Sequence, residues 1–285
     1  MNNEFDAAGA ARPRSEPAAE GGQMDVAGAL TKLREILSRS AGVAIAYSGG
    51  MDSGFLALAA VRWRGSEQVR AYVVASELMP PTETERALRL AERFKIPCER
   101  LEISVLPLPV FREHPPDRCY HCKREIFARL LAVVPAGWRL VEGSNLDDRN
   151  DYRPGKRALA ELGVGSPLDE AGFTKAMIRQ MLQEWGAADF IRLPMPCLAT
   201  RIPFGTPVEA ETLRQIGEGE AILAAVGLAG ARLRHHGAIA RIEVTPADLP
   251  RALPLLQSVA PRLRALGFRF VTLDVEGYRQ GSMNW

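Results

Sequence analysis

Short apolar runs alternate along most of this chain with segments in which apolar residues recur every three or four positions. A run that is apolar throughout is typical of a strand covered on both faces, and the three-to-four spacing is typical of an amphipathic helix. Their alternation predicts an α/β fold with a doubly wound parallel sheet. The predicted strands are residues 43–47, 69–75, 99–105 and 139–142, and the predicted helices include residues 26–37 and 123–133.

Polar residues follow the predicted strands closely. Parallel sheets of this kind bind ligands at the carboxyl ends of their strands, where Ser48, Ser76 and Ser144 fall. The segment 82–85 has the pattern of a capping box and therefore predicts the start of a helix. The prolines between residues 107 and 116 favour an extended active-site loop over regular structure.

The pattern changes near residue 207, where two helical patterns and three strand-like runs predict a smaller α+β domain over residues 207–285. Pro254 and Pro261 interrupt the second helical pattern and predict a late start and a kink. Residues 24–206 would form the main domain. Residues 1–23 have almost no large apolar side chain and are predicted to be a disordered tail. The helices are predicted at 209–226 and 249–266, and the strands at 231–236, 239–244 and 269–275.

The clearest chemical signal is the stretch from Gly42 to Ser53, where an apolar run ends in Ser-Gly-Gly-Met-Asp-Ser. Gly49 and Gly50 let the backbone turn tightly, and the helical spacing that follows places the loop at a helix N-terminus, whose free N–H groups suit phosphate. No Gly-Lys-Ser/Thr follows, so this is not a Walker A loop. It resembles the PP-loop of the ATP pyrophosphatases, which implies adenylation with release of pyrophosphate and an adenine nucleotide alpha hydrolase-like fold.

Composition excludes several functional classes. The 36 basic and 34 acidic side chains leave a net charge of +2 over 285 residues, which gives no global reason to expect nucleic acid as a partner. No apolar run reaches the length of a membrane span, and the N-terminus lacks a signal-peptide pattern. We therefore expect a cytoplasmic protein with free or liganded thiols, among which Cys98 is interpreted as a small buried hydrophobic residue.

Three other cysteines carry the candidate chemistry. Cys119 and Cys122 precede a predicted helix, and Cys197 lies between prolines. Thiols near a helix N-terminus have a lowered pKa, so Cys119 and Cys122 are predicted thiolates and soft-metal ligands. The spacing leaves three interpretations open: ligands of a 4Fe-4S cluster with one open iron, a zinc site completed by His114 or His121, or unliganded thiols.

Eight segments, in chain order, carry a family resemblance. They are Ser-Gly-Gly-Met-Asp-Ser (48–53), Arg-Cys-Tyr-His-Cys-Lys (118–123), Glu-Gly-Ser-Asn-Leu-Asp-Asp (142–148), Asp-Tyr-Arg-Pro-Gly (151–155), Ser-Pro-Leu (166–168), Cys-Leu-Ala-Thr-Arg-Ile-Pro-Phe-Gly (197–205), Arg-Leu-Arg-His-His-Gly (232–237) and Glu-Gly-Tyr-Arg-Gln-Gly-Ser-Met-Asn (276–284). Together they resemble the LarE family of ATP-dependent sulfur transferases. Those proteins convert pyridinium-3,5-biscarboxylic acid mononucleotide to its thiocarboxylate in making the nickel-pincer nucleotide of lactate racemase.

The resemblance implies roles for particular residues. ATP and magnesium would be cofactors, because pyrophosphate leaves readily only when its charge is neutralised. Cys197 matches the sacrificial sulfur donor of single-cysteine members, whereas Cys119 and Cys122 resemble the three-cysteine branch, in which a 4Fe-4S cluster carries an extra sulfide. The residues implied at the pyrophosphate are Ser48, Gly49, Gly50, Asp52 and Ser53, with Asp52 near magnesium, and those implied near the nucleoside are Ser76, Gly143, Ser144 and Asp148.

Arginines mark a second candidate site. Arg232, Arg234 and His236 alternate along a predicted strand and therefore share one face. Together with Arg201, the two arginines would bind the substrate's phosphate, although a solvated basic strand is the alternative. The resemblance also implies a homo-oligomer, and it leaves sulfide or another sulfur donor as a further partner.

Two other functions compete with sulfur transfer to a pyridinium nucleotide. A PP-loop tRNA thiolase also uses a Cys-x-x-Cys pair with a third cysteine, but the near-neutral charge and the lack of a recognisable RNA-binding appendage argue against it. A non-catalytic adenine-nucleotide-binding module would leave the thiols unexplained. The sequence therefore predicts an adenylating enzyme that transfers sulfur.

Overall fold

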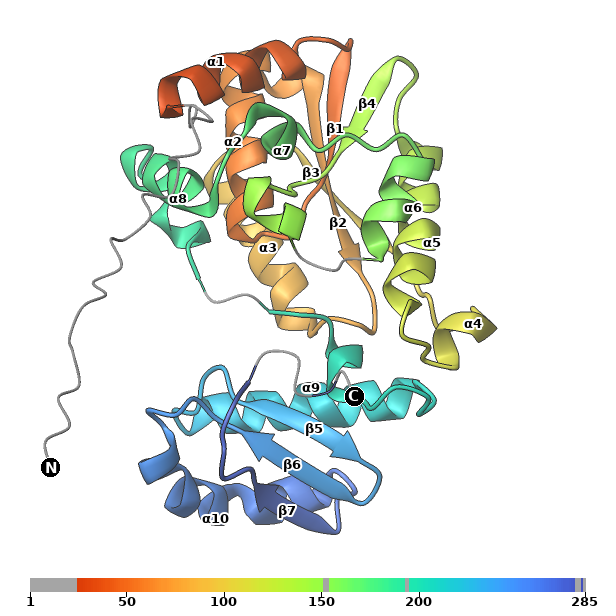
Figure 1. The fold of residues 1–285 in the computed structure, drawn as a ribbon, viewed down its shortest axis with the longest axis vertical. Coiled ribbons are helices and arrows are strands. Elements are labelled where there is room, and N and C mark those ends of the chain that lie inside the picture. The colour runs from red at the N-terminus through yellow and green to blue at the C-terminus, as the bar shows by residue number, and fades with distance from the viewer. Residues whose placement is uncertain (1–24, 151–153, 193–194, 280–282, 284–285) are drawn as a thin grey trace, which may run out of the picture.

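The computed structural model describes residues 25–150, 154–192, 195–279 and 283. The predicted tail over residues 1–23 lies outside this description, as do parts of the 151–155 and 276–284 segments. Figure 1 shows two lobes, which we call the large lobe (the elements from α1 to η4) and the small lobe (the elements from α9 to β7). The predicted domain boundary at residue 206 stays a prediction.

A parallel four-stranded sheet forms the centre of the large lobe. Its strands are β1 (Gly42–Ala46), β2 (Val69–Ala75), β3 (Cys98–Glu102) and β4 (Trp138–Val141), in the order β3-β2-β1-β4. The chain moves outward from β1 to β3 and then returns to the other side of β1. The α/β class is therefore confirmed, and the point where the strand order reverses lies between β1 and β4, where such sheets bind ligands.

Helices cover both faces of this sheet (Figure 1). Val43 and Ile45 of β1 belong to one core with Phe55, whereas Ala44 belongs to a second core with Phe127. Because successive strand residues point to opposite faces, this division is what a sheet buried on both sides requires. The first core includes residues of α1 (Val26–Leu37), α2 (Met51–Arg64), α3 (Pro81–Arg93), α7 (Pro167–Ala171) and α8 (Lys175–Glu184), and the second includes residues of α5 (Arg118–Val133) and α6 (Gly155–Glu161).

Three local predictions are wrong. α3 begins at Pro81 without a side-chain cap, because proline at the first helical position already has a helical φ and places Thr82 inside the helix. The proline-rich connection contains a one-turn helix, α4 (Pro109–Arg112), with Pro109 in that same position. α5 begins at Arg118, so Cys119 and Cys122 lie within its first two turns instead of before it. Short 3₁₀ helices complete the lobe: η1 (Ser66–Gln68), η2 (Leu146–Asn150), η3 (Ala188–Phe190) and η4 (Leu198–Arg201).

The small lobe is a three-stranded sheet with two helices. Pro254 and Pro261 lie inside the second helix, which begins at Leu249 in contrast to the predicted late start, because its buried apolar face stabilises the helix through both prolines. β5 pairs antiparallel with β6, and β6 pairs parallel with β7. The elements are α9 (Ala210–Ala225), β5 (Arg232–His236), β6 (Ile239–Glu243), α10 (Leu249–Ala265) and β7 (Phe270–Leu273).

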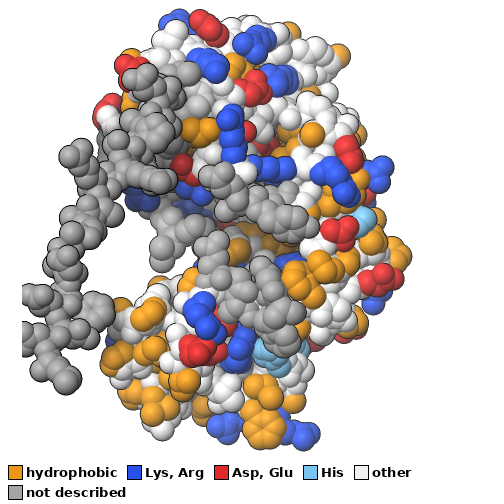
Figure 2. All heavy atoms as spheres, viewed as in Figure 1, with side chains coloured by type: hydrophobic (Ala, Val, Ile, Leu, Met, Phe, Trp, Pro, Cys, Tyr) orange, Lys and Arg blue, Asp and Glu red, His pale blue; other side chains and the backbone are white. Residues whose placement is uncertain are grey.

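The segment around Cys197 joins the lobes. Leu198, Ala199 and Ile202 are buried in the same core as Leu213 of α9 and Leu233 of β5. Figure 1 shows α9 on the side of the small lobe that faces the large lobe, and the space-filling view shows the surface hollowed between them (Figure 2). The small lobe therefore positions the backbone that carries Cys197.

Candidate active site

The loop between β1 and α2 has the geometry of a phosphate cradle. Gly49 has a φ of 69°, and a Cβ there would lie 2.7 Å from Cβ of Ala87, so a larger residue would be strained and would clash. Ser48 and Ser53 hydroxyl oxygens are 3.0 Å apart, and the Ser48 N–H donates to Ser53 Oγ. The N-cap of α2, Gly50, makes no side-chain hydrogen bond. The first turn of α2 therefore lacks a side-chain cap, as a helix start that binds an anion requires.

The loop after β4 packs directly against this cradle. A Cβ on Gly143 would lie 2.8 Å from the Ser53 nitrogen, so only glycine allows so close an approach. The buried Glu142 carboxylate accepts hydrogen bonds from Ser144 N–H (3.0 Å), Ser144 Oγ (2.8 Å) and Ser166 Oγ (2.6 Å). Neither Glu142 nor Ser166 carries a role predicted from the sequence. Their hydrogen bonds hold the loop rigidly beside the PP-loop.

A cavity of about 510 Å³ opens between the two loops and α5. Its volume suits a small-molecule ligand. Gly49 and Gly50 do not line it but shape the backbone, and the predicted arginines also lie outside its lining. The predicted residues that line it are Ser48, Asp52, Ser53, Ser76, Gly143, Ser144, Asp148, Cys119, Cys122 and Cys197.

An apolar wall on the α5 side, which was not predicted from the sequence, completes the cavity. Tyr72 and Val74 of β2 contribute to it, together with Ile126, Phe127 and Leu130 of α5. Their three-to-four spacing on α5 is that of an ordinary core face, so the sequence offers no signal that separates them from core residues. A wall of this kind accommodates a flat aromatic ring.

The structure places the thiols of Cys119, Cys122 and Cys197 around this one cavity. Burial raises the pKa of Cys122 and of Cys197, and the charge of Arg118 opposes the rise at both thiols. For Cys122 this is the reverse of the predicted lowering, because loss of hydration outweighs the effect of the helix N-terminus. Within the described ranges, no group of His, Cys, Asp and Glu side chains is arranged to hold a metal ion.

Neither candidate histidine ligand lines the cavity. His114 is fully buried, and its Nδ1 lies 2.9 Å from the Pro203 carbonyl oxygen. His121 Nε2 lies 3.4 Å from the Asp117 carboxylate, on the same helix face. The zinc interpretation therefore lacks its fourth ligand in this arrangement.

Acid is expected to destabilise the protein through His114. Burial, with a smaller contribution from the nearby Arg118 charge, lowers the pKa of His114 to about 4. Because the unfolded chain binds more protons than the folded one between about pH 4 and 6.5, the free energy of unfolding falls as pH falls through this window. Between pH 7 and pH 5, the free energy of unfolding measured in urea should fall by about 2 kcal/mol less for His114→Asn than for wild type. An equal loss in both proteins would contradict this assignment.

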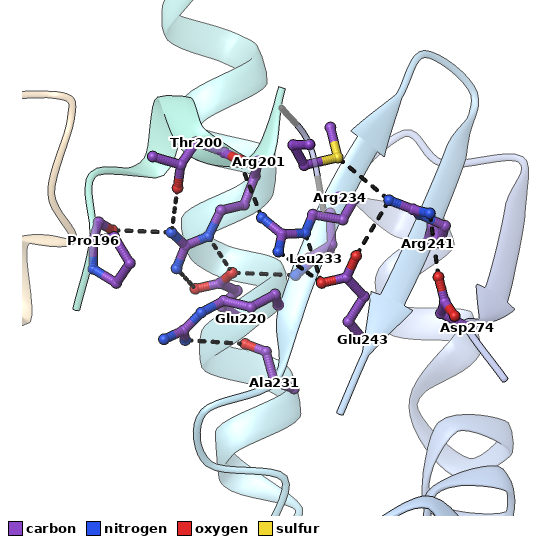
Figure 3. Close-up of polar contacts among 12 residues, drawn as sticks. Pro196, Thr200, Arg201, Glu220, Ala231, Leu233, Arg234, Arg241, Glu243 and Asp274 are labelled. Atoms are coloured by element: carbon purple, nitrogen blue, oxygen red, sulfur yellow. Dashed lines mark hydrogen bonds and ion pairs between the residues drawn. The ribbon is translucent and has the colours of Figure 1, made fainter. Parts of the chain in front are cut away.

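Two of the predicted phosphate-binding arginines, Arg201 and Arg234, form ion pairs (Figure 3), and neither they nor Arg232 line the cavity. Arg201 is fully buried, and its Nε and Nη2 donate to Glu220 at 2.8 and 3.0 Å. Its Nη1 donates to the carbonyl oxygens of Pro196 (3.0 Å) and Cys197 (3.3 Å). Arg201 therefore holds the backbone on both sides of the Cys197 peptide.

A second ion-pair group continues across β5 and β6 (Figure 3). Arg234 donates to Glu243 at 2.6 and 2.9 Å and to the Thr200 carbonyl oxygen at 3.0 Å. Arg241 joins Glu243 to Asp274, each at 3.2 Å. Glu243 and Asp274 thus bind arginines within the small lobe. The structure connects the Cys197 segment to this sheet through Thr200.

Comparison with known proteins identifies the family. A family model described as NAD synthase matches residues 30–125, which contain the PP-loop. Pyridinium-3,5-bisthiocarboxylic acid mononucleotide synthase from Lactiplantibacillus plantarum is 34% identical over 244 residues, covering 85% of this chain and 88% of that protein. The chain belongs to this synthase family. The resemblance found in the sequence motifs is thereby confirmed.

Two further relatives match over similar lengths. An uncharacterized protein from Synechocystis sp. is 34% identical over 259 residues, covering 90% of this chain and 96% of that protein. One from Methanocaldococcus jannaschii is 26% identical over 242 residues, covering 83% and 90%. Membership places the chain among enzymes, and the PP-loop is that of an ATP-using family. In the part of the chain that the structure describes, no helix combines the length and apolar composition of a membrane span.

Proposed function

We propose that this enzyme activates a carboxylate of pyridinium-3,5-biscarboxylic acid mononucleotide with ATP and converts it to a thiocarboxylate. The observation that carries the proposal is that one cavity is lined both by the PP-loop residues Ser48 and Ser53 and by the thiols of Cys119, Cys122 and Cys197. An activated carboxylate formed at the loop therefore arises beside sulfur nucleophiles. The name of the Lactiplantibacillus plantarum relative supports the substrate class.

Adenylation uses the loop and the wall. The β and γ phosphates bind at Ser48 to Ser53 and the start of α2, and the adenine lies against the apolar wall on α5. Asp52, which lines the cavity, would provide a carboxylate for magnesium, whose charge would neutralise the leaving pyrophosphate. A substrate carboxylate oxygen attacks the α phosphorus, and the bond to the bridging oxygen of pyrophosphate breaks. The product is an acyl adenylate.

Sulfur transfer then uses Cys197. Its thiolate attacks the acyl carbon, AMP leaves, and a thioester forms. Loss of the Cys197 Cα proton with breakage of its Cβ–S bond releases the thiocarboxylate and leaves dehydroalanine. If Cys119, Cys122 and Cys197 together bind three irons of a 4Fe-4S cluster, the cluster supplies a replaceable sulfide and Cys197 is preserved. The cluster-bound state is our proposal for repeated turnover, and it rests on the three cysteines lining one cavity, since the described side chains do not already form a metal-binding group.

The phosphate of the substrate is proposed to bind on the β5 side. Arg232 and Arg234 lie with their guanidinium carbons 5.7 and 6.0 Å from the Tyr278 ring centroid. Arg201 and Arg234, which are buried against Glu220 and Glu243, are better placed to hold the Cys197 segment than to contact phosphate, so Arg232 is the arginine proposed for this contact. The phosphate would thus lie toward the small lobe and the pyridinium ring toward Cys197.

The test is turnover by the anaerobically purified protein with ATP, magnesium and the biscarboxylate mononucleotide. We expect pyrophosphate and AMP to form only when the mononucleotide is present, and mass spectrometry to find oxygen replaced by sulfur in the product. Iron and acid-labile sulfide are measured in the same preparation, because multiple turnovers without iron would contradict the cluster. ATP cleavage that does not depend on the mononucleotide would contradict the proposed function.

A further inference from the structure

Arg118 is a buried cation inside the candidate active site. It is the first residue of α5, only 7% exposed, and it lines the same cavity as the three thiols and the PP-loop. Its guanidinium carbon lies 4.7 Å from the centroid of the Phe204 ring. Stacking on an aromatic face leaves the edge of the guanidinium, where its N–H groups point, available to a ligand in the plane.

Among the residues that the structure describes, none pairs with the Arg118 guanidinium as a carboxylate or accepts a hydrogen bond from it. The contrast with the two buried arginines of the ion-pair groups is clear, because Arg201 binds Glu220 and Arg234 binds Glu243. The Arg118 nitrogens are not among the fully buried side-chain atoms that lack a hydrogen-bond partner, so the edge of the guanidinium is open to the cavity. Such a group in a ligand cavity indicates that an anionic ligand supplies the missing partner.

The position of Arg118 in the cavity indicates which anionic ligand it binds. Its charge acts on both the Cys122 and Cys197 thiols, so it lies at the sulfur end of the cavity. The PP-loop at Ser48 and Ser53 already provides for the phosphates of ATP. The remaining ligand is the sulfur acceptor, which under the proposed function carries two carboxylates on one pyridinium ring.

We propose that Arg118 binds the carboxylate that is not being activated, and so aligns the other carboxyl group with the α phosphate and Cys197. This inference rests on the proposed function. The first carboxylate loses its charge on adenylation, whereas the second stays anionic and fits the planar guanidinium in a two-point hydrogen-bonded pair. Arg118 is thus a specificity-determining residue for a ring with two acid groups.

Two mononucleotides with the same ribose phosphate isolate the carboxylate contact. Nicotinic acid mononucleotide has one carboxylate, and nicotinamide mononucleotide has an uncharged amide of the same shape. Binding is measured by calorimetry with α,β-methylene ATP present, whose α–β link cannot be cleaved. We expect wild type to prefer the acid roughly 100-fold, because the amide leaves Arg118 without its partner. Arg118→Gln should reduce this preference to below about 3-fold, and Arg118→Lys should give an intermediate value.

The matched control is Arg157→Gln. Arg157 also stacks on an aromatic ring, at 3.8 Å from the Tyr120 centroid, but its side chain is 63% exposed and does not line the cavity. This variant should keep the wild-type preference. Affinity for α,β-methylene ATP should stay within about 3-fold of wild type in every variant, which shows that each is folded.

A pyrophosphate-release assay distinguishes the carboxylate that binds Arg118 from the carboxylate that is adenylated. Nicotinic acid mononucleotide should bind to wild type without releasing pyrophosphate from ATP, because its single carboxylate occupies Arg118. Pyrophosphate release with it at a rate close to that of the biscarboxylate, or an undiminished acid preference in Arg118→Gln, would overturn the assignment. If Arg118→Gln lost as much affinity for α,β-methylene ATP as for nicotinic acid mononucleotide, Arg118 would instead bind ATP. If Arg118→Gln does not fold, Arg118→Lys provides the test. A wild-type preference for the acid over the amide mononucleotide in Arg118→Lys would overturn the assignment of Arg118 to the second carboxylate. Wild type that binds the ATP analogue but no mononucleotide contradicts the proposed function itself.

Discussion

Replacing Cys197 with Ala is expected to lower thiocarboxylate formation by at least about 1,000-fold while ATP-dependent adenylation stays within about 3-fold of wild type. The thiol is needed to attack the acyl adenylate, but the attack of the carboxylate on ATP involves only the loop at Ser48 to Ser53 and the bound metal. The two steps are measured separately, by isotope exchange between pyrophosphate and ATP and by mass spectrometry of the nucleotide product.

The other cysteines provide the controls. Cys98 lies at the start of β3, outside the cavity lining, and burial raises the pKa of its thiol to about 11, so Cys98→Ala should retain both steps. Cys119→Ala and Cys122→Ala should lose multiple turnover and bound iron together. Sulfur transfer that persists through many turnovers in either variant would show that the three cysteines do not act as a unit. Loss of exchange in Cys197→Ala would instead place this thiol in the adenylation step.

Replacing Glu220 with Ala is expected to have the largest effect on stability, about 3–5 kcal/mol of unfolding free energy. Glu220 is 9% exposed, and its carboxylate accepts hydrogen bonds from the fully buried Arg201 guanidinium and from the Leu233 N–H at 3.1 Å. Its removal leaves the buried Arg201 charge without its counter-ion and the buried Leu233 N–H without its acceptor. Urea unfolding, followed by circular dichroism, measures the change.

A matched control lies on the same helix. Glu218 of α9 also pairs with an arginine, at 2.8 Å from Arg214, but both side chains are about half exposed. Glu218→Ala should therefore unfold at nearly the wild-type urea concentration, because water and salt screen exposed ion pairs. Equal destabilisation in the two variants would show that burial of the Arg201 pair does not control stability.

Since Arg201 also holds the Cys197 carbonyl oxygen, Glu220→Ala should in addition slow sulfur transfer more than adenylation.

Local sequence patterns were sufficient to predict much of the fold. The helix at Val26–Leu37 was predicted with its observed bounds, and the four predicted strands occur in one parallel sheet. These elements are specified by apolar spacing, which local sequence carries directly. The starts of α3 and α5 were misplaced because Thr82 was interpreted as a helix cap and the Cys-x-x-Cys segment as lying before its helix, when both are helical. Boundaries depend on hydrogen bonds that short patterns specify weakly.

The sequence by itself determined the class of chemistry, through the glycines and serines of the PP-loop and through cysteines whose spacing is informative without coordinates. Only the tertiary structure decided the state and neighbours of those groups. Burial of Cys122 and Cys197 depends on packing between α5 and the distant 197–201 segment, and it reverses the local rule for a thiol near a helix N-terminus. Likewise Glu220 lies 19 residues beyond Arg201 and meets it only because α9 packs beside that segment, whereas Arg118 meets no acid at all among the described residues. Charge pairing and hydration depend on distances between residues far apart in the chain, and those distances are set by folding.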